Sequence, residues 1–308
     1  MDSISQAVLG AAVQGALLGK VQGRRALLYG AALGTLPDLD VFVRYADPVS
    51  SMTYHRGFSH SVFVLTALAA LMTWLVRRRW PHAAYSTGRF FTAVWLVLIT
   101  HVLLDAFTVY GTQMFWPLAP TPESWAAIFI IDPVYTVPLL LAVLMALAIG
   151  LAGKGGGVLV GALVFSTAYL GFGLGGRLLA EQRVGEALRA VPMPLNTLVW
   201  RVIALGPGGQ QIEAVSSLFD REAPEWVRLP PQSDVRHVLK GVPLYERLRW
   251  FTGDWLRLDV IGDALVVSDL RMGIAGQYTF RFQMAQCDAS TGHWQVVTPS
   301  AWPSVRPG

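Results

Sequence analysis

The sequence predicts an α-helical multi-pass membrane bundle followed by a smaller β-rich extracytoplasmic domain. Of the 308 residues, 53% are apolar and only 14% are charged, a composition typical of membrane proteins. The charge is also unevenly distributed, with 10 basic and 7 acidic residues in 1–176 but 14 and 13 in the shorter stretch 177–308. We therefore predict a membrane domain over 1–176 and a linker helix with a soluble domain over 177–308.

Apolar runs predict the membrane helices. We expect them over residues 4–19, 26–36, 61–76, 90–109, 133–152 and 158–176. The second run is short, because 11 residues at about 1.5 Å each cover about half of a hydrocarbon core of ~30 Å. Small residues at Gly10, Gly15 and Gly19 favour close packing of the first helix against its neighbours.

Basic turns predict the orientation. Lys20 to Arg25, Arg77 to Arg79 and Lys154 each lie between apolar runs, and such turns face the cytoplasm. This assignment places residues 41–59 and 110–132 as outer connections of a protein in a bacterial inner membrane, with its C-terminal domain outside the cytoplasm. Because the basic residues are explained by these turns, we expect no nucleic-acid binding.

The pattern changes after residue 176. A linking helix is expected near Glu181 to Leu188, followed by segments that mix β-branched, aromatic and alternating polar residues. The predicted strands are Thr197 to Ala204, Trp255 to Ile261, Ala264 to Ser268 and Tyr278 to Met284. The only cysteine is Cys287, which excludes an internal disulfide and a cysteine metal cluster.

Three polar clusters lie close to the outer ends of apolar runs. They are Asp38 with Asp40, then His55 with Arg56 and His60, and finally His101 with Asp105. Ionisable residues near the hydrocarbon are costly unless they are paired or hydrated, so they are functional candidates. His101 and Asp105 are four residues apart, which places both on one face of a helix.

Histidine and carboxylate ligands without thiolates are compatible with zinc, manganese or iron. Three histidines and three aspartates are enough for one divalent ion, with zinc as our leading choice, or for two ions that share a carboxylate. Such an ion lowers the pKa of a bound water and polarises an ester. The planar guanidinium of Arg56 suits a phosphate group.

Each cluster also has a structural interpretation. Asp38 and Asp40 are typical of helix caps or turns, and His101 with Asp105 of a hydrogen-bonded pair inside a helix bundle. Arg56 is typical of a lipid headgroup anchor. The presence of all three clusters in the same half of the membrane favours a shared metal site.

Several motifs resemble those of the bacterial membrane-bound, predicted metal-dependent hydrolase family described as LexA-regulated. The resemblance is carried by Leu36-Pro-Asp-Leu-Asp40, His55-Arg-Gly-Phe-Ser-His-Ser61 and His101-Val-Leu-Leu-Asp105, and it continues in Ile131-Asp-Pro133 and Asp269-Leu-Arg-Met-Gly273. It implies that the metal ligands are Asp38, Asp40, His55, His60, His101 and Asp105. A more distant similarity to zinc-dependent phospholipase C and P1 nuclease implies a phosphoester substrate.

We therefore predict a membrane hydrolase in which a metal-activated water attacks a phosphoester of a lipid or a lipid-linked molecule, with catalytic roles for Asp40 and Arg56. One alternative is a metal-ion or proton transporter that uses the same side chains. Another is a membrane scaffold without catalysis, whose β-rich domain binds a partner.

Overall fold

The computed structural model describes residues 1–308 apart from 82–83, 185–187, 207–209, 223, 275 and 304–308. Its first part is helical, as predicted. The helices are α1 (Ser3–Gln22), α2 (Arg25–Thr35), α3 (Pro48–Tyr54), α4 (Val62–Arg79), α5 (Thr87–Ala106), α6 (Pro133–Ile149) and α7 (Lys154–Val184), with the short 3-10 helices η1 (Pro37–Phe42) and η2 (Phe58–His60). The predicted connection 41–59 thus contains α3, which begins where Asp47 caps the backbone N–H of Ser50.

Among the described residues, three helices are long and apolar enough to cross a membrane: Ser3–Gln22, Thr87–Ala106 and Lys154–Arg183. A fourth candidate is the pair Pro48–His60 and Val62–Arg79, which is bent by 46°. α2 and α6 have 11 and 17 residues and are shorter than these candidates. Length and composition therefore support three or four crossings, fewer than the number of apolar runs.

α1 lies at the centre of the helical part and packs against α2, α5, α6 and α7. Its close approach to α2 depends on glycine. A Cβ added at Gly10 would lie 2.2 Å from the carbonyl oxygen of Gly30, and one added at Gly34 would lie 2.5 Å from that of Gln6. The predicted close packing of the first helix through small residues is confirmed.

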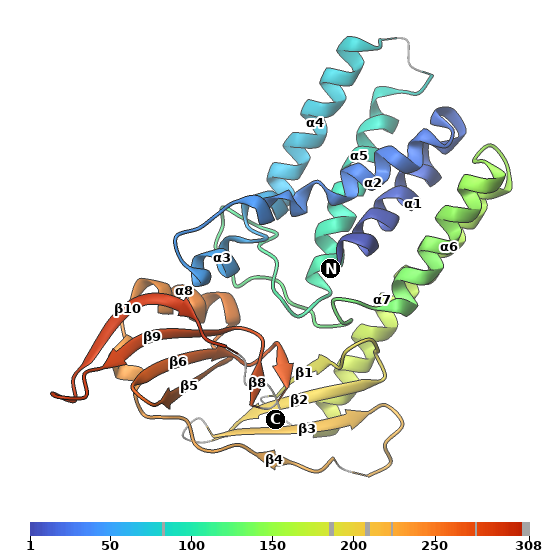
Figure 1. Ribbon diagram of the computed structural model, residues 1–308. Helices are drawn as coiled ribbons and strands as arrows, with labels where there is room; N and C mark the ends of the chain where they lie inside the picture. The colour runs from blue at the N-terminus through green and yellow to red at the C-terminus, as the bar shows by residue number, and fades with distance from the viewer. Residues whose placement is uncertain (82–83, 185–187, 207–209, 223, 275, 304–308) are drawn as a thin grey trace.

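The basic turns and the polar clusters lie at opposite ends of the helical part. Figure 1 shows the α1–α2, α4–α5 and α6–α7 connections at one end and the β-strands at the other. Arg24, Arg77 and Lys154 lie at or beside the first group of turns. The relative placement predicted from the charges is therefore confirmed, whereas the side of the membrane that each end faces stays a prediction.

The second part is β-rich, as predicted, and the structure shows that its sheets are antiparallel. One sheet has the order β1-β2-β3-β4 and another the order β10-β9-β6-β5, while β7 and β8 form a small hairpin. The strands are β1 (Leu188–Pro192), β2 (Val199–Leu205), β3 (Gln211–Ser217), β4 (Val227–Arg228), β5 (Leu256–Ile261), β6 (Ala264–Asp269), β7 (Gly273–Ile274), β8 (Gln277–Tyr278), β9 (Arg281–Cys287) and β10 (Trp294–Ala301), with α8 (Pro243–Thr252) preceding β5.

The predicted linking helix is wrong as a separate element. α7 continues without a break to Val184, residues 185–187 lie outside the described residues, and β1 begins at Leu188. The helix therefore extends beyond the predicted boundary at residue 176, and the division into two domains stays a prediction.

The two parts are joined beside the polar clusters. The buried residues Val49 and Tyr110 from the helical part belong to one apolar cluster with Phe251 of α8. The guanidinium of Arg247 lies 3.6 Å from the ring centre of Tyr54 and donates to the Thr53 carbonyl. These contacts hold α3, and with it the following segment, against the β-rich part.

Candidate metal centre

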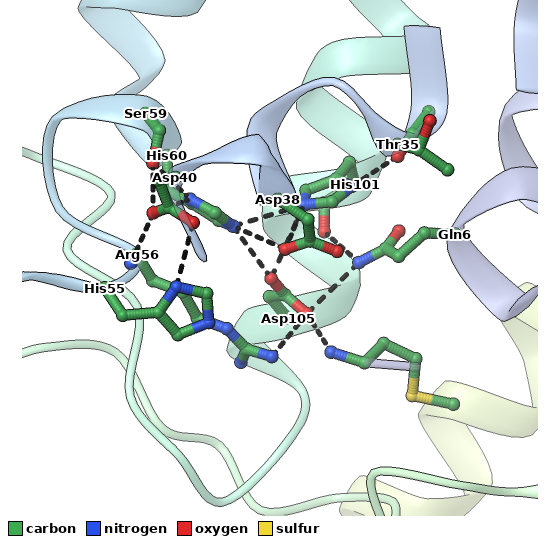
Figure 2. A network of polar contacts seen from close by, with 12 residues as sticks. Gln6, Thr35, Asp38, Asp40, His55, Arg56, Ser59, His60, His101 and Asp105 are labelled. Atoms are coloured by element: carbon green, nitrogen blue, oxygen red, sulfur yellow. Dashed lines mark hydrogen bonds and ion pairs between the residues drawn. The ribbon is translucent and has the colours of Figure 1, made fainter. Parts of the chain in front are cut away.

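Four side chains converge on one point at the end of the helical part. Asp38 comes from η1, His60 from η2, and His101 and Asp105 from successive turns of α5. One ligand atom of each lies within 4.8 Å of all the others, and Figure 2 shows the four groups turned toward one another. The predicted convergence of three sequence clusters is confirmed for these four residues.

Five of the six distances between the four atoms are close to the edge length of a coordination tetrahedron, and the sixth, between the two carboxylate oxygens, is within 4.8 Å. His60 Nε2 lies 3.2 Å from His101 Nε2, 3.4 Å from Asp38 Oδ1 and 3.1 Å from Asp105 Oδ2. His101 Nε2 lies 3.5 Å from Asp38 Oδ1 and 3.6 Å from Asp105 Oδ2. Ligands at 2.0–2.1 Å from a tetrahedral ion are separated by about 3.3–3.4 Å.

The backbone of α2 fixes the orientation of His101. Nδ1 of this imidazole lies 2.6 Å from the carbonyl oxygen of Gly34. Since a carbonyl only accepts hydrogen bonds, Nδ1 carries the proton and donates it. Neutral His101 therefore presents a lone pair on Nε2 to the centre.

Ser59 fixes His60 in the same way. Its hydroxyl donates to Asp40 Oδ2 at 2.6 Å, because a carboxylate only accepts. The hydroxyl oxygen then accepts from His60 Nδ1, which lies 2.9 Å away. Neutral His60 thus also turns a lone pair on Nε2 toward the centre.

All four converging atoms are therefore acceptors when both imidazoles are neutral. Lone pairs of two nitrogens and two carboxylate oxygens repel one another at these distances unless a positive charge lies between them. The centre is also buried: the side chains of His60, His101 and Asp105 are at most 1% exposed, and that of Asp38 is 19% exposed. This donor set fits a divalent metal ion.

The second oxygen of Asp105 faces away from the centre and is surrounded by donors. Oδ1 accepts from Gln6 Nε2 at 3.1 Å and pairs with Arg56 Nη2 at 3.2 Å and with the α-amino group of Met1. Arg56 is buried, donates to Thr108, and lies over the ring of Tyr110. The guanidinium predicted to meet the substrate therefore lies beneath a ligand, and its predicted role stays untested.

Asp40 and His55 lie beside the four ligands and contact each other. Asp40 Oδ1 lies 2.8 Å from His55 Nδ1, and Oδ2 accepts from the backbone N–H of Arg56 at 3.0 Å. His60 reaches Asp40 only through Nδ1, at 3.8 Å. Asp40 thus lies behind His60, in the position of an outer carboxylate that orients a ligating imidazole.

Both η1 carboxylates have lowered pKa values. Burial raises the pKa of Asp38, but in the form without a bound cation, in which Nε2 of His101 and His60 carries a proton, the hydrogen bonds from these two rings outweigh burial and hold the pKa well below its ordinary value. For Asp40, burial again raises the pKa, and hydrogen bonding to His55 and Ser59 more than offsets it. Both groups are therefore ionised at neutral pH, which is the form that binds a cation.

A cavity of about 680 Å³ adjoins the outer pair. Asp40 and His55 line it together with Arg44 and Tyr45 of the helical part and Phe280 to Phe282 of the β-rich part. The cavity therefore lies between the two parts and opens beside Asp40 and His55.

Three contributors were not identified from the sequence. Ser59 lies inside the histidine motif, and the Gly34 carbonyl is a backbone group that no side-chain pattern marks. Gln6 differs from its apolar neighbours in α1, and this polarity in a buried helix was the available signal.

The fold and the centre define a membrane protein whose helical part contains a His/Asp group with the donor set of a metal site, followed by a β-rich C-terminal region. A family model covers residues 1–179, which include every residue of the centre. The chain belongs to the YdjM inner membrane protein family.

The chain is also similar to the uncharacterized protein YfhP of Bacillus subtilis (strain 168), with 28% identity over 165 residues. The match covers 51% of this chain and 49% of YfhP, so the chain spans about half the length of this relative. No solved structure matches the chain.

Proposed function

We propose that the protein is a membrane-embedded, metal-dependent hydrolase that cleaves a phosphoester of a lipid or lipid-linked molecule on the extracytoplasmic side. The observation that carries the proposal is the set of four converging lone pairs, on His60, His101, Asp38 and Asp105, beside a cavity. A divalent ion bound there, zinc in the first place and manganese or iron as alternatives, supplies an activated water and polarises the ester.

Asp38 controls access to the centre. It is the one ligand of the four with appreciable exposure, so water and substrate approach past its carboxylate. Four protein ligands complete a tetrahedron, and hydrolysis therefore requires an ion that accepts an additional ligand. Zinc does so by expanding to five ligands, while manganese and iron commonly bind six.

His55 is placed for proton transfer. Its side chain is 25% exposed, lines the cavity, and is held at Nδ1 by Asp40. This arrangement fixes the ring and leaves the Nε2 lone pair free to take a proton from the attacking water and to pass that proton to the leaving alkoxide. Asp40 thereby orients two histidines. It holds His55 toward the cavity directly, and it holds His60 toward the centre through the hydroxyl of Ser59.

Metal analysis of the purified membrane protein tests the proposal. We expect one equivalent of a divalent ion, with phosphodiester hydrolysis that is lost on chelation and restored on addition of that ion. His60→Ala and His101→Ala should lose both the ion and the activity. A parent protein without stoichiometric metal would contradict the proposal.

His55→Gln is the matched variant, because it leaves the four ligands in place. We expect it to retain the ion but lose about 100-fold or more in turnover, the range that general acid–base catalysis contributes. Full activity in His55→Gln would exclude the proton-transfer role while leaving the metal assignment intact.

A second candidate, transport of a metal ion or proton, is favoured by one observation. Gln14 and Gln22 of α1 line a cavity of about 580 Å³ at the end near the basic turns. The buried Oε1 of Gln14 has no hydrogen-bond partner among the described residues. However, Leu33 and Val94 also line this cavity, and the buried Leu98 follows one turn further toward His101 on α5. Cation-dependent counterflux in liposomes, abolished in Gln14→Leu, would favour transport.

A further inference from the structure

We propose that the centre takes an anionic phospholipid directly from the bilayer, with the acyl chains on an apolar rim and the headgroup phosphate against Arg44. This inference rests on the proposed function and names its substrate class and binding residues. It is argued from three features of the same face: exposed apolar side chains around the ligands, an arginine without a protein partner, and continuity with the lipid-facing side of a candidate span.

The segments that carry the ligands also expose large apolar side chains. In η1, Asp38 and Asp40 alternate with Leu39 and Val41, and Phe42 is 78% exposed. In η2, Phe58 is 60% exposed two residues before the ligand His60. We call Leu39, Val41, Phe42, Phe58 and Trp116 the apolar rim.

The segments that carry the rim are held together by hydrogen bonds and by one ring contact. Ser59 and the backbone of Arg56 hydrogen bond to Asp40, which ties η1 to η2. Phe58 packs edge-on against Trp116 at 5.2 Å between ring centres. An apolar surface of this size costs free energy in water, and aromatic residues of this kind are enriched where a protein meets the membrane interface.

The position of α4 beside the rim indicates that membrane lipid covers the rim. α4 begins at Val62, directly after η2, and belongs to the bent candidate span. Its side chains Phe63, Leu71, Trp74 and Leu75 are exposed in the same manner as the rim. The rim therefore continues the apolar surface of α4 up to the ligands, and the hydrocarbon that covers α4 extends to the centre.

Arg44 supplies the headgroup contact. It lines the 680 Å³ cavity with Asp40 and His55, and it makes no hydrogen bond or ion pair within the described part of the chain. Arg56 by contrast is committed to Asp105 and Thr108. Arg44 is thus the cation of the two that is free to pair with a phosphate in two parallel hydrogen bonds.

The first experiment measures whether the rim enters lipid. A nitroxide is attached to Phe42→Cys in a Cys287→Ser protein that is reconstituted in vesicles of phosphatidylcholine and phosphatidylglycerol. Phe219→Cys is the matched control, because Phe219 is 75% exposed but lies in the turn after β3. We expect position 42 to collide with oxygen and position 219 with a water-soluble nickel complex. Equal access of nickel to both labels would overturn the proposal.

The second experiment measures headgroup selection. Protein is re-extracted from vesicles with equal amounts of the two lipids, and the retained lipids are quantified. The parent and Arg228→Gln, a control at an exposed arginine of β4, should be enriched in phosphatidylglycerol. Arg44→Gln should lose about fivefold of this enrichment, the effect of one cation at an anionic surface.

An unchanged lipid ratio in Arg44→Gln would overturn the headgroup assignment. Neither experiment needs a bound ion or turnover. A protein that inserts its rim and selects the anionic lipid but hydrolyses nothing would therefore contradict the proposed function alone. A hydrolase with a water-exposed rim would contradict only this inference.

Discussion

Two buried polar clusters, one in each part of the protein, contain similar residues but differ in how their charges are arranged. In the β-rich part, Arg201 donates to both carboxylate oxygens of Glu213, at 2.7 and 2.5 Å, and to the carbonyls of Leu270 and Gly273. Every acceptor there faces a donor. In the metal centre, lone pairs of His60, His101, Asp38 and Asp105 face one another instead.

The difference separates a structural ion pair from a binding site. A guanidinium and a carboxylate satisfy each other, and their burial requires nothing further. Four acceptors around one point require positive charge between them, supplied either by a metal ion or by protons on the two imidazoles. Burial and charge alone would have indicated a functional site in both clusters. The direction of the hydrogen bonds distinguishes the ion pair from the candidate metal site.

The largest expected effect is on metal affinity. Asp38→Ala removes a ligand that, within the described part of the chain, pairs with the two imidazoles, so no buried arginine or amino group loses its partner. We expect metal affinity to fall by more than the 10–100-fold typical of changes behind the ligands. The measurement is competition with a chelator of known affinity. Retention of parent affinity would mean that the four atoms are not a metal site.

A change in the ion pair of the β-rich part should lower stability without affecting metal binding. Glu213→Gln leaves the buried guanidinium of Arg201 without its counter-charge, and breaking such a pair costs about 3–5 kcal/mol. Thermal unfolding in detergent should begin at a lower temperature, while the metal content of the folded protein stays at that of the parent. A loss of metal here would show that the two clusters are coupled.

A smaller loss of metal affinity is expected from changes to residues that orient the ligands without binding the ion. Ser59→Ala removes the hydroxyl that connects Asp40 with His60 Nδ1. The His60 ring is then free to exchange its proton between the two nitrogens, and we expect a 10–100-fold loss of affinity. Ser51→Ala, at a serine that lines the cavity but does not contact Asp40 or His60 in the described structure, serves as the control and should bind metal as the parent does.

The sequence predicted the parts of the centre that depend on side-chain type. A histidine and an aspartate four residues apart on an apolar helix, and a Pro-Asp-Leu-Asp turn after a short one, indicated a shared cation site before any contact was known. The helical first part and the strands around Val199–Leu205 and Leu256–Ile261 followed from their periodicity.

The sequence did not separate ligands from supporting residues. Asp38 and Asp40 are two residues apart in an irregular turn, and only the folded η1 shows that one faces the centre and the other His55. The sequence also did not show which way Arg56 points. Its neighbour His55 lines the cavity, whereas the side chain of Arg56 is buried. Backbone direction in short segments has no periodic pattern from which it can be predicted.

The smallest expected effect concerns the backbone that orients His101. A Cβ at Gly34 would lie 2.5 Å from the Gln6 carbonyl, so Gly34→Ala forces α2 away from α1 and displaces the carbonyl that accepts from His101. We expect metal affinity to fall by up to about tenfold, because the ring keeps its place on α5 but loses its fixed proton position. Gly161→Ala is the control, since no atom lies within 4 Å of the added Cβ, and it should be neutral or slightly stabilising in a helix. Equal metal affinity in both variants would show that ligand convergence, without the Gly34 hydrogen bond, is sufficient to bind the ion.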